Sequence, residues 1–149
     1  MKLKIVFLSF ISVGLIIYLF IMFFLPNTDA KSKIKVNEIS KKLNSNQTIL
    51  IPTGFGVKNV FLIDDGVLSP YIDVQLSHDI NVSIYSSSDI DYEGGRKVRN
   101  RIVNNLNIRE YQTKDHRVIY LFKDGKLNYL YEFDETYRKR IDEYLLKEI

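Results

Sequence analysis

The pattern of apolar and polar residues changes character early in the chain. Residues 5–25 read IVFLSFISVGLIIYLFIMFFL, a stretch without one charged residue. A helix of this length rises about 30 Å and matches the hydrocarbon core of a bilayer, where backbone groups must pair within their own segment. We therefore expect a transmembrane helix over Ile5 to Leu25, preceded by a cationic tip over residues 1–4.

Beyond this segment the pattern becomes helical and then alternates. Residues 26–46 are predicted to be a polar juxtamembrane linker with a short helix, in which Val36, Ile39 and Leu43 share one face. Residues 47–149 are predicted to form one extracytoplasmic α+β domain. β-Branched and alternating stretches predict strands over residues 48–51, 57–63, 71–76, 80–85, 108–113, 117–122 and 127–133.

Strict alternation also predicts which side of two strands is buried. In residues 71–76 and 80–85 the isoleucines, valines and leucine share one face. The outward positions include Asp73, Gln75, Asn81 and Ser83. Such neighbouring strands are typical of an antiparallel sheet with one wet face. Residues 77–79 are expected to join them, and Asp124-Gly125 is a strong hairpin signal further along.

Two helices complete the expected domain. Val98, Ile102 and Leu106 fit one face of a helix over residues 96–106. Asp134 is a good N-cap for a C-terminal helix. Its apolar stripe would contain Tyr137, Ile141, Tyr144, Leu145 and Ile149, with Arg138 and Asp142 facing water. The fold class is thus α+β, with six or seven antiparallel strands packed against a C-terminal amphipathic helix.

Charge and composition mainly exclude functions. Lys2 and Lys4 precede the apolar segment, which leaves 19 basic residues against 18 acidic ones and a net charge of +1. A nearly neutral domain gives no reason to expect nucleic acid as a partner. Because the chain has no cysteine, disulfides, thiolate nucleophiles and cysteine zinc sites are excluded. No cofactor is predicted.

The apolar segment has two interpretations. Lys2 and Lys4 also suit a signal peptide, with Thr28-Asp29-Ala30 as its cleavage site, but the long apolar run favours a retained anchor. Lysines flank the segment on both sides, and the count used by the positive-inside rule is even or slightly favours a cytoplasmic C-terminus. The compact cationic tip favours a C-terminal domain outside the cell membrane.

Candidate catalytic and metal-binding residues all fall in predicted loops. His78 and His116 are the only histidines, and no metal-binding spacing joins them. The acidic clusters are Asp64-Asp65 and the run from Asp89 to Glu93, which lacks the pattern of a calcium loop. For both histidines and both acidic clusters, we favour the interpretation that they are solvated turn residues.

A dense basic run gives the candidate interaction surface, which consists of Arg96, Lys97, Arg99 and Arg101. It follows Gly94-Gly95 but lacks the spacing of a nucleotide-binding loop. Anionic lipid or wall polymer is its possible partner, and a solvated face paired with local acids is the commoner outcome. An exposed row of Tyr120, Tyr129 and Tyr131 would suit sugar rings or a peptide, although cross-strand packing is favoured.

The segment Pro52-x-Gly54-Phe55, which follows the short helix, resembles the opening of a known domain. This is the Pro-x-Gly-Phe β-rich extracytoplasmic domain of unknown function in Gram-positive membrane and anti-sigma-factor-like proteins. The later order of hairpins and closing helix is also similar. The resemblance implies an envelope-facing sensing or binding module without an established activity.

We therefore expect a single-pass, non-enzymatic envelope protein whose partners are the bilayer, through Ile5 to Leu25, and an unknown envelope protein or polymer. The first alternative is an assembly subunit that packs its transmembrane helix against another membrane protein. Further alternatives are a secreted factor released by signal cleavage and a weak hydrolase using His78 or loop acids.

Overall fold

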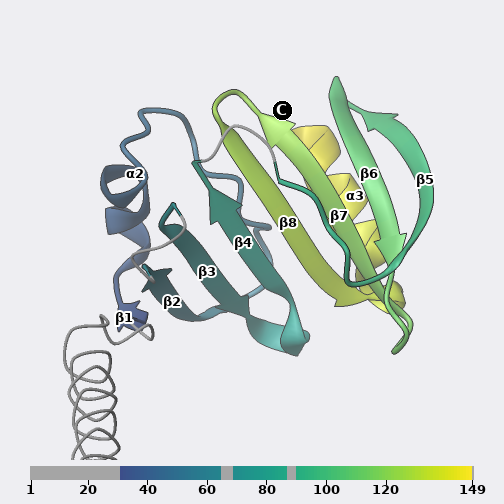
Figure 1. The fold of residues 1–149 in the computed structure, drawn as a ribbon, viewed down its shortest axis with the longest axis horizontal. Coiled ribbons are helices and arrows are strands. Elements are labelled where there is room, and N and C mark those ends of the chain that lie inside the picture. The colour runs from purple at the N-terminus through teal and green to yellow at the C-terminus, as the bar shows by residue number, and fades with distance from the viewer. Residues whose placement is uncertain (1–30, 65–68, 87–89, 149) are drawn as a thin grey trace, which may run out of the picture.

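The described part of the chain in this computed structural model, residues 31–64, 69–86 and 90–148, is organised around one antiparallel sheet. Its eight strands lie in the order β1-β2-β3-β4-β8-β7-β6-β5 (Figure 1). The strands are β1 (Lys31–Lys33), β2 (Val57–Ile63), β3 (Tyr71–Leu76), β4 (Asn81–Tyr85), β5 (Arg96–Val103), β6 (Leu106–Gln112), β7 (Arg117–Asp124) and β8 (Leu127–Asp134). The helices are α2 (Ile39–Lys42) and α3 (Arg138–Lys147), with 3-10 turns η1 (Val36–Glu38), η2 (Ser77–Asp79) and η3 (Glu135–Tyr137).

The apolar segment Ile5 to Leu25 lies outside the described residues. Within the ranges that are described, no helix has the length and apolar character needed to cross a bilayer. The α+β class, the antiparallel sheet and the C-terminal helix are confirmed.

The helix predicted over residues 96–106 is wrong. These residues form β5, a two-residue turn and the start of β6, with Val103 paired to Leu106. Asn104 and Asn105 have φ of 45° and 67°, the left-handed conformation that a tight hairpin turn requires and that asparagine tolerates. The register shifts between Lys97 and Arg99, so Val98 occupies a bulge. This bulge and the asparagine turn together produced apolar spacing that resembles a helix.

Two further differences bring the number of strands to eight. The three-residue strand β1, Lys-Ser-Lys, carries no apolar signal and pairs with β2 only in the folded chain. Residues 48–51 are not a strand. Their backbone instead bonds to tyrosine hydroxyls, because Tyr131 donates to the Leu50 carbonyl at 2.8 Å and the Leu50 amide donates to Tyr129 at 3.4 Å.

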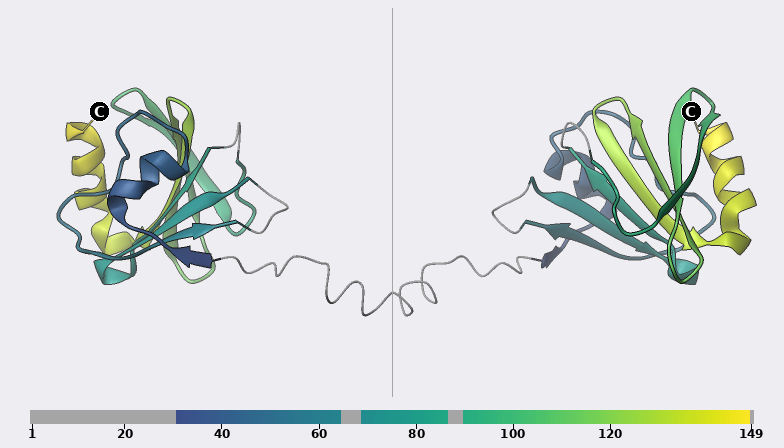
Figure 2. Two further views of the ribbon diagram at one scale, coloured as in Figure 1. Left: turned by 90° about the vertical axis from the view of Figure 1, so that its left-hand side faces the viewer. Right: turned by 45° about the vertical axis from the view of Figure 1, so that its right-hand side comes forward.

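The inner face of the sheet carries the main core. The inward residues predicted for β3 and β4, among them Ile72 and Val82, are buried. Ile39 and Leu43 from the α2 region pack against the same core, together with Ile141 and Leu145 of α3. Figure 2 shows α3 lying along one side of the twisted sheet. The two short helices therefore close the core on this face.

The Pro52-x-Gly54-Phe55 segment fixes the loop before β2 to the start of α3. Gly54 has a φ of +87°, which favours glycine. Phe55 is buried and contacts the Tyr137 ring edge-on at 5.8 Å between ring centroids. Arg140 lies over the Phe55 ring at 4.3 Å and donates to the Gly54 carbonyl at 3.0 Å. In this structure the segment has a clear packing role.

Residues 90–95, which lead into β5, cross the outer face of the sheet, in front of β8 and β7 in Figure 1. Ile90 and Tyr92 pack there against a second apolar cluster of Tyr111, Ile119 and Leu121. Arg109 fixes the segment by donating to the Ile90 carbonyl and to Asp91. The outer face is thus covered over β6, β7 and part of β8.

Candidate binding face

The structure divides the predicted basic surface into two parts. Arg96 and Lys97 are exposed at the start of β5, an edge strand of the sheet. Arg99 contacts Glu110 at 3.0 Å, and Arg101 pairs with both Glu110 and Asp142. Gly95 lies against the backbone of Gln112, where an added Cβ would come within 2.6 Å of the carbonyl oxygen. A strand follows the glycines, so no helix N-terminus is present here for a phosphate.

The two inner arginines belong to an ion network centred on Glu110. This carboxylate is 3% exposed and also contacts Arg138 of α3 at 2.9 Å. Burial alone would raise the pKa of Glu110, but hydrogen bonds and charge from Arg138 and Arg99 outweigh it and lower the pKa. Tyr120 donates to Asp142 at 3.0 Å and accepts from Arg138 at 3.1 Å.

This network links α3 to β5, β6 and β7. Arg138 and Asp142, expected to face water, instead have side chains only 22% and 23% exposed. A general acid needs a raised pKa near the working pH, whereas arginines hold Glu110 in its charged form. The arrangement is therefore suited to holding the helix in place.

The two histidines lie on separate turns. His78, in η2, is exposed and lies 5.1 Å from the Tyr137 ring between centroids. His116 is exposed between β6 and β7. Of the predicted loop acids, Asp91 pairs with Arg109, while Asp65 and Asp89 are outside the described residues. Across the described ranges, no three His, Asp or Glu side chains are grouped as a metal site would require.

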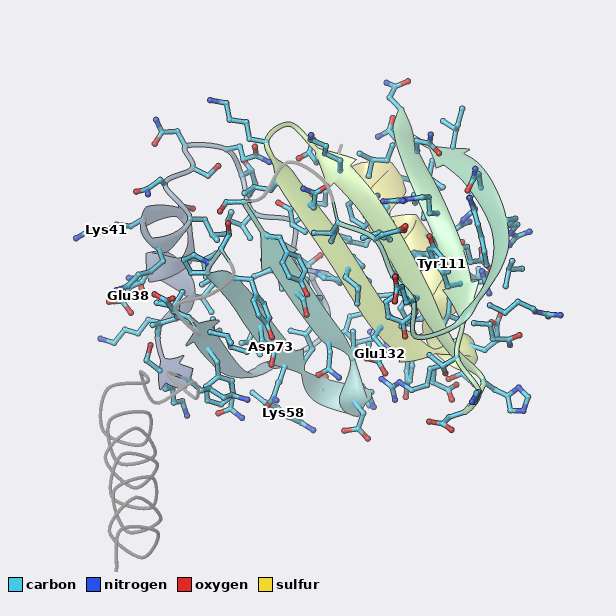
Figure 3. All side chains as sticks on the ribbon, in the orientation of Figure 1. Glu38, Lys41, Lys58, Asp73, Tyr111 and Glu132 are labelled. Atoms are coloured by element: carbon cyan, nitrogen blue, oxygen red, sulfur yellow. The ribbon has the colours of Figure 1, made fainter. Side chains whose placement is uncertain are left out.

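The outer face over β2, β3 and β4 carries a different set of side chains, which we name the open face. The pairing registers align them in three cross-strand rows. The rows are Ile63–Tyr71–Tyr85, Phe61–Asp73–Ser83, and Asn59–Gln75–Asn81 extended by Glu132 of β8. All of these residues are intermediate in burial, and Figure 3 shows Asp73 and Glu132 on this side of the sheet.

Aromatic rings lie at one end of the open face. The rings of Tyr71 and Tyr85 stack with 4.8 Å between centroids and 20° between planes. The Lys31 ammonium lies 4.0 Å from the centroid of Phe61. Burial raises the pKa of Tyr85, which hydrogen-bonds Ser83. The Tyr71–Tyr85 row thus lies next to the polar centre of the open face.

The polar centre contains carboxylates and amides. Burial raises the pKa of Asp73, an effect that the nearby Lys31 opposes and Glu132 reinforces. Glu132 itself pairs with Arg117 of β7. Asn59 donates to Gln75 at 3.2 Å and accepts from Lys33 at 2.9 Å. Acids and bases are balanced here, so the open face carries no strong charge of either sign.

Sequence reasoning identified the outward positions of β3 and β4 but not their combination with tyrosines. The proposed aromatic row Tyr120, Tyr129 and Tyr131 is fully buried, which confirms the cross-strand packing interpretation. Tyr71 and Tyr85 have the same strand parity as Asp73 and Ser83. The alternating pattern of the sequence therefore places both tyrosines on the outward face. Their position opposite each other depends on the register of the hairpin between β3 and β4.

Comparison of the chain with family models, curated proteins and solved structures found no match. The fold defines the class, an α+β domain with an open antiparallel sheet and helices closing one face.

Proposed function

We propose that this chain is a single-pass membrane-anchored, non-enzymatic envelope protein whose external domain binds a glycan polymer on the open face. One observation carries the proposal, namely the partly exposed, stacked Tyr71–Tyr85 pair beside a centre of carboxylate and amide groups. The anchor is the segment Ile5 to Leu25, and its length and lack of charge support that role.

The side-chain chemistry favours a glycan over a charged polymer. Sugar rings present apolar CH faces, which pack on aromatic rings such as Tyr71 and Tyr85. Their hydroxyl groups donate to carboxylates such as Asp73 and exchange hydrogen bonds with the amides Gln75 and Asn81. Because the open face carries little net charge, a neutral strand fits it better than a polyanion.

Pull-down of the full chain in detergent on insoluble peptidoglycan tests this proposal. Tyr71→Ala should raise the apparent Kd about fivefold, which corresponds to about 1 kcal/mol for one lost aromatic contact. Asp73→Asn should also weaken binding. Tyr137→Ala is the matched control, because this half-buried tyrosine contacts Phe55 and His78 away from the open face.

Near-UV circular dichroism of the tyrosines would establish that each variant is folded. Wild-type binding by folded Tyr71→Ala and Asp73→Asn variants would refute a glycan site on the open face. Protease treatment of intact cells tests the orientation separately, since only an external domain is cut.

A further inference from the structure

The N-terminal edge of the domain carries an excess of basic charge. Residues 31–42 contain five lysines and one glutamate, a net charge of +4. Residues 43–149 contain 14 basic and 16 acidic residues, a net charge of −2. The overall near-neutrality of the domain therefore conceals a basic segment next to a slightly acidic remainder.

The fold keeps these lysines together at the outside of the sheet. Lys31 and Lys33 belong to β1, an edge strand, and Lys41 and Lys42 belong to α2 beside it. All are exposed, as is Lys35 between them. Figure 3 shows Lys41 and Glu38 projecting from this side of the domain. We name the five lysines, with β1 and α2, the lysine edge.

The charge of the lysine edge is largely uncompensated. Its one acid, Glu38, accepts a hydrogen bond from the Lys35 backbone amide at 2.7 Å and so caps the turn η1. Within the described part of the chain, no acid lies within ion-pair distance of Lys35, Lys41 or Lys42. These three ammonium groups are available to an anionic surface.

The position of the lysine edge in the sheet points to that surface. Lys31 follows Leu25 by six residues, which span at most about 22 Å when extended. The opposite edge, β5, is separated from β1 by the full order of the sheet. At about 4.8 Å per strand spacing, this separation is roughly 34 Å along a flat sheet.

We infer that the lysine edge docks on anionic lipid headgroups, so that the sheet stands on its β1 edge with β5 farthest from the bilayer. This inference rests on the membrane anchoring in the proposed function. Each lysine near an anionic surface strengthens the association about fivefold. In this orientation the open face is perpendicular to the bilayer and stays accessible.

Single-cysteine labelling of the full chain in lipid nanodiscs tests the orientation, since the native chain has no cysteine. Asn37→Cys places a fluorophore on the lysine edge, and Asn100→Cys places one on β5; both asparagines are exposed. The discs contain a headgroup-attached nitroxide quencher and either phosphatidylcholine alone or phosphatidylcholine with phosphatidylglycerol. In anionic discs, quenching at position 37 should exceed that at position 100 at least twofold and should fall in high salt.

Charge variants separate docking from simple proximity to the anchor. Combining Lys35→Gln, Lys41→Gln and Lys42→Gln should reduce quenching at position 37 to its level in neutral discs. The matched control replaces the exposed lysines 114, 126 and 147 by glutamine and should leave quenching unchanged.

Equal quenching at position 37 in neutral and anionic discs, or equal effects of the two triple variants, would overturn the inference. Failure of the anchor gives a different result, because the protein would then not co-elute with the discs at all.

Discussion

Replacing Glu110 by glutamine tests whether the buried ion network holds α3 in place. The carboxylate is 3% exposed and receives hydrogen bonds or charge contacts from Arg99 at 3.0 Å, Arg138 at 2.9 Å and Arg101 at 3.7 Å. Removing one partner of a buried ion pair costs about 3–5 kcal/mol, because the remaining charge is left uncompensated. The arginines are 21–54% exposed and can turn partly to water. We therefore expect a loss of about 3 kcal/mol in the free energy of unfolding.

Thermal unfolding followed by near-UV circular dichroism of the full chain in detergent measures this loss. For a domain of this size, 3 kcal/mol corresponds to a decrease in Tm of roughly 10 °C. Glu143→Gln is the matched control, because its exposed pair with Lys139 is 4.0 Å long. Such a surface pair contributes at most about 1 kcal/mol.

The pH dependence gives an independent check. The pKa of Glu110 is lower in the folded chain than its ordinary value of 4.5, so its stabilisation is complete above that pH. The stabilisation is lost as the pH falls through the folded-state pKa. The difference in Tm between wild type and Glu110→Gln should therefore shrink below pH 4. A variant within 2 °C of wild type at pH 7, or a difference unchanged down to pH 3, would refute this account.

Three further predictions address the rest of the fold. Deleting residues 137–149 removes the buried Ile141 and Leu145, worth about 1.5–3 kcal/mol each, and should abolish cooperative unfolding; a retained thermal transition would contradict the role of α3. Asn105→Gly should raise stability by up to about 1 kcal/mol in a urea titration, because φ is +67° there, whereas Asn100→Gly within β5 should lower it. Burial raises the pKa of Tyr129 to about 12, so the stabilisation from its neutral form is present below pH 10 and lost above it. The difference in absorbance at 295 nm between wild type and Tyr129→Phe should place the ionisation of this tyrosine near pH 12 or at the unfolding transition, and a difference that appears near pH 10 in the folded chain would count against its burial.

The ranges of several strands could be predicted from the local pattern of apolar and polar residues. The predicted range 57–63 coincides with β2, which is rich in β-branched and apolar residues. The range 71–76 coincides with β3, where strict alternation allows only one face of the strand to be buried. The Asp124-Gly125 hairpin was predictable from its turn residues, and Gly125 has a φ of +55°. The C-terminal helix had an apolar stripe, and its predicted cap Asp134 instead caps the 3-10 turn η3 that leads into α3, where it accepts from the Thr136 amide at 2.9 Å.

The errors occurred where distant residues decided the local structure. The spacing of Val98 and Ile102 fits a helix or a bulged strand, and pairing with β6 selected the strand. Arg138 and Asp142 looked like surface residues because their partners, Glu110 and Arg101, are far away in sequence. Residues 48–51 have the composition of a strand. In the fold, however, the backbone amide and carbonyl of Leu50 form hydrogen bonds with the hydroxyls of two β8 tyrosines rather than with a neighbouring strand.

By itself the sequence determined the apolar segment, the α+β class, the inward residues of two strands and the absence of cysteine chemistry. Only the tertiary structure decided the strand order, which puts the lysine edge and β5 at opposite ends of the sheet and aligns Tyr71 with Tyr85. The physical reason is that alternation and spacing are properties of neighbouring residues. Strand order and cross-strand rows depend on contacts between segments that no local pattern encodes.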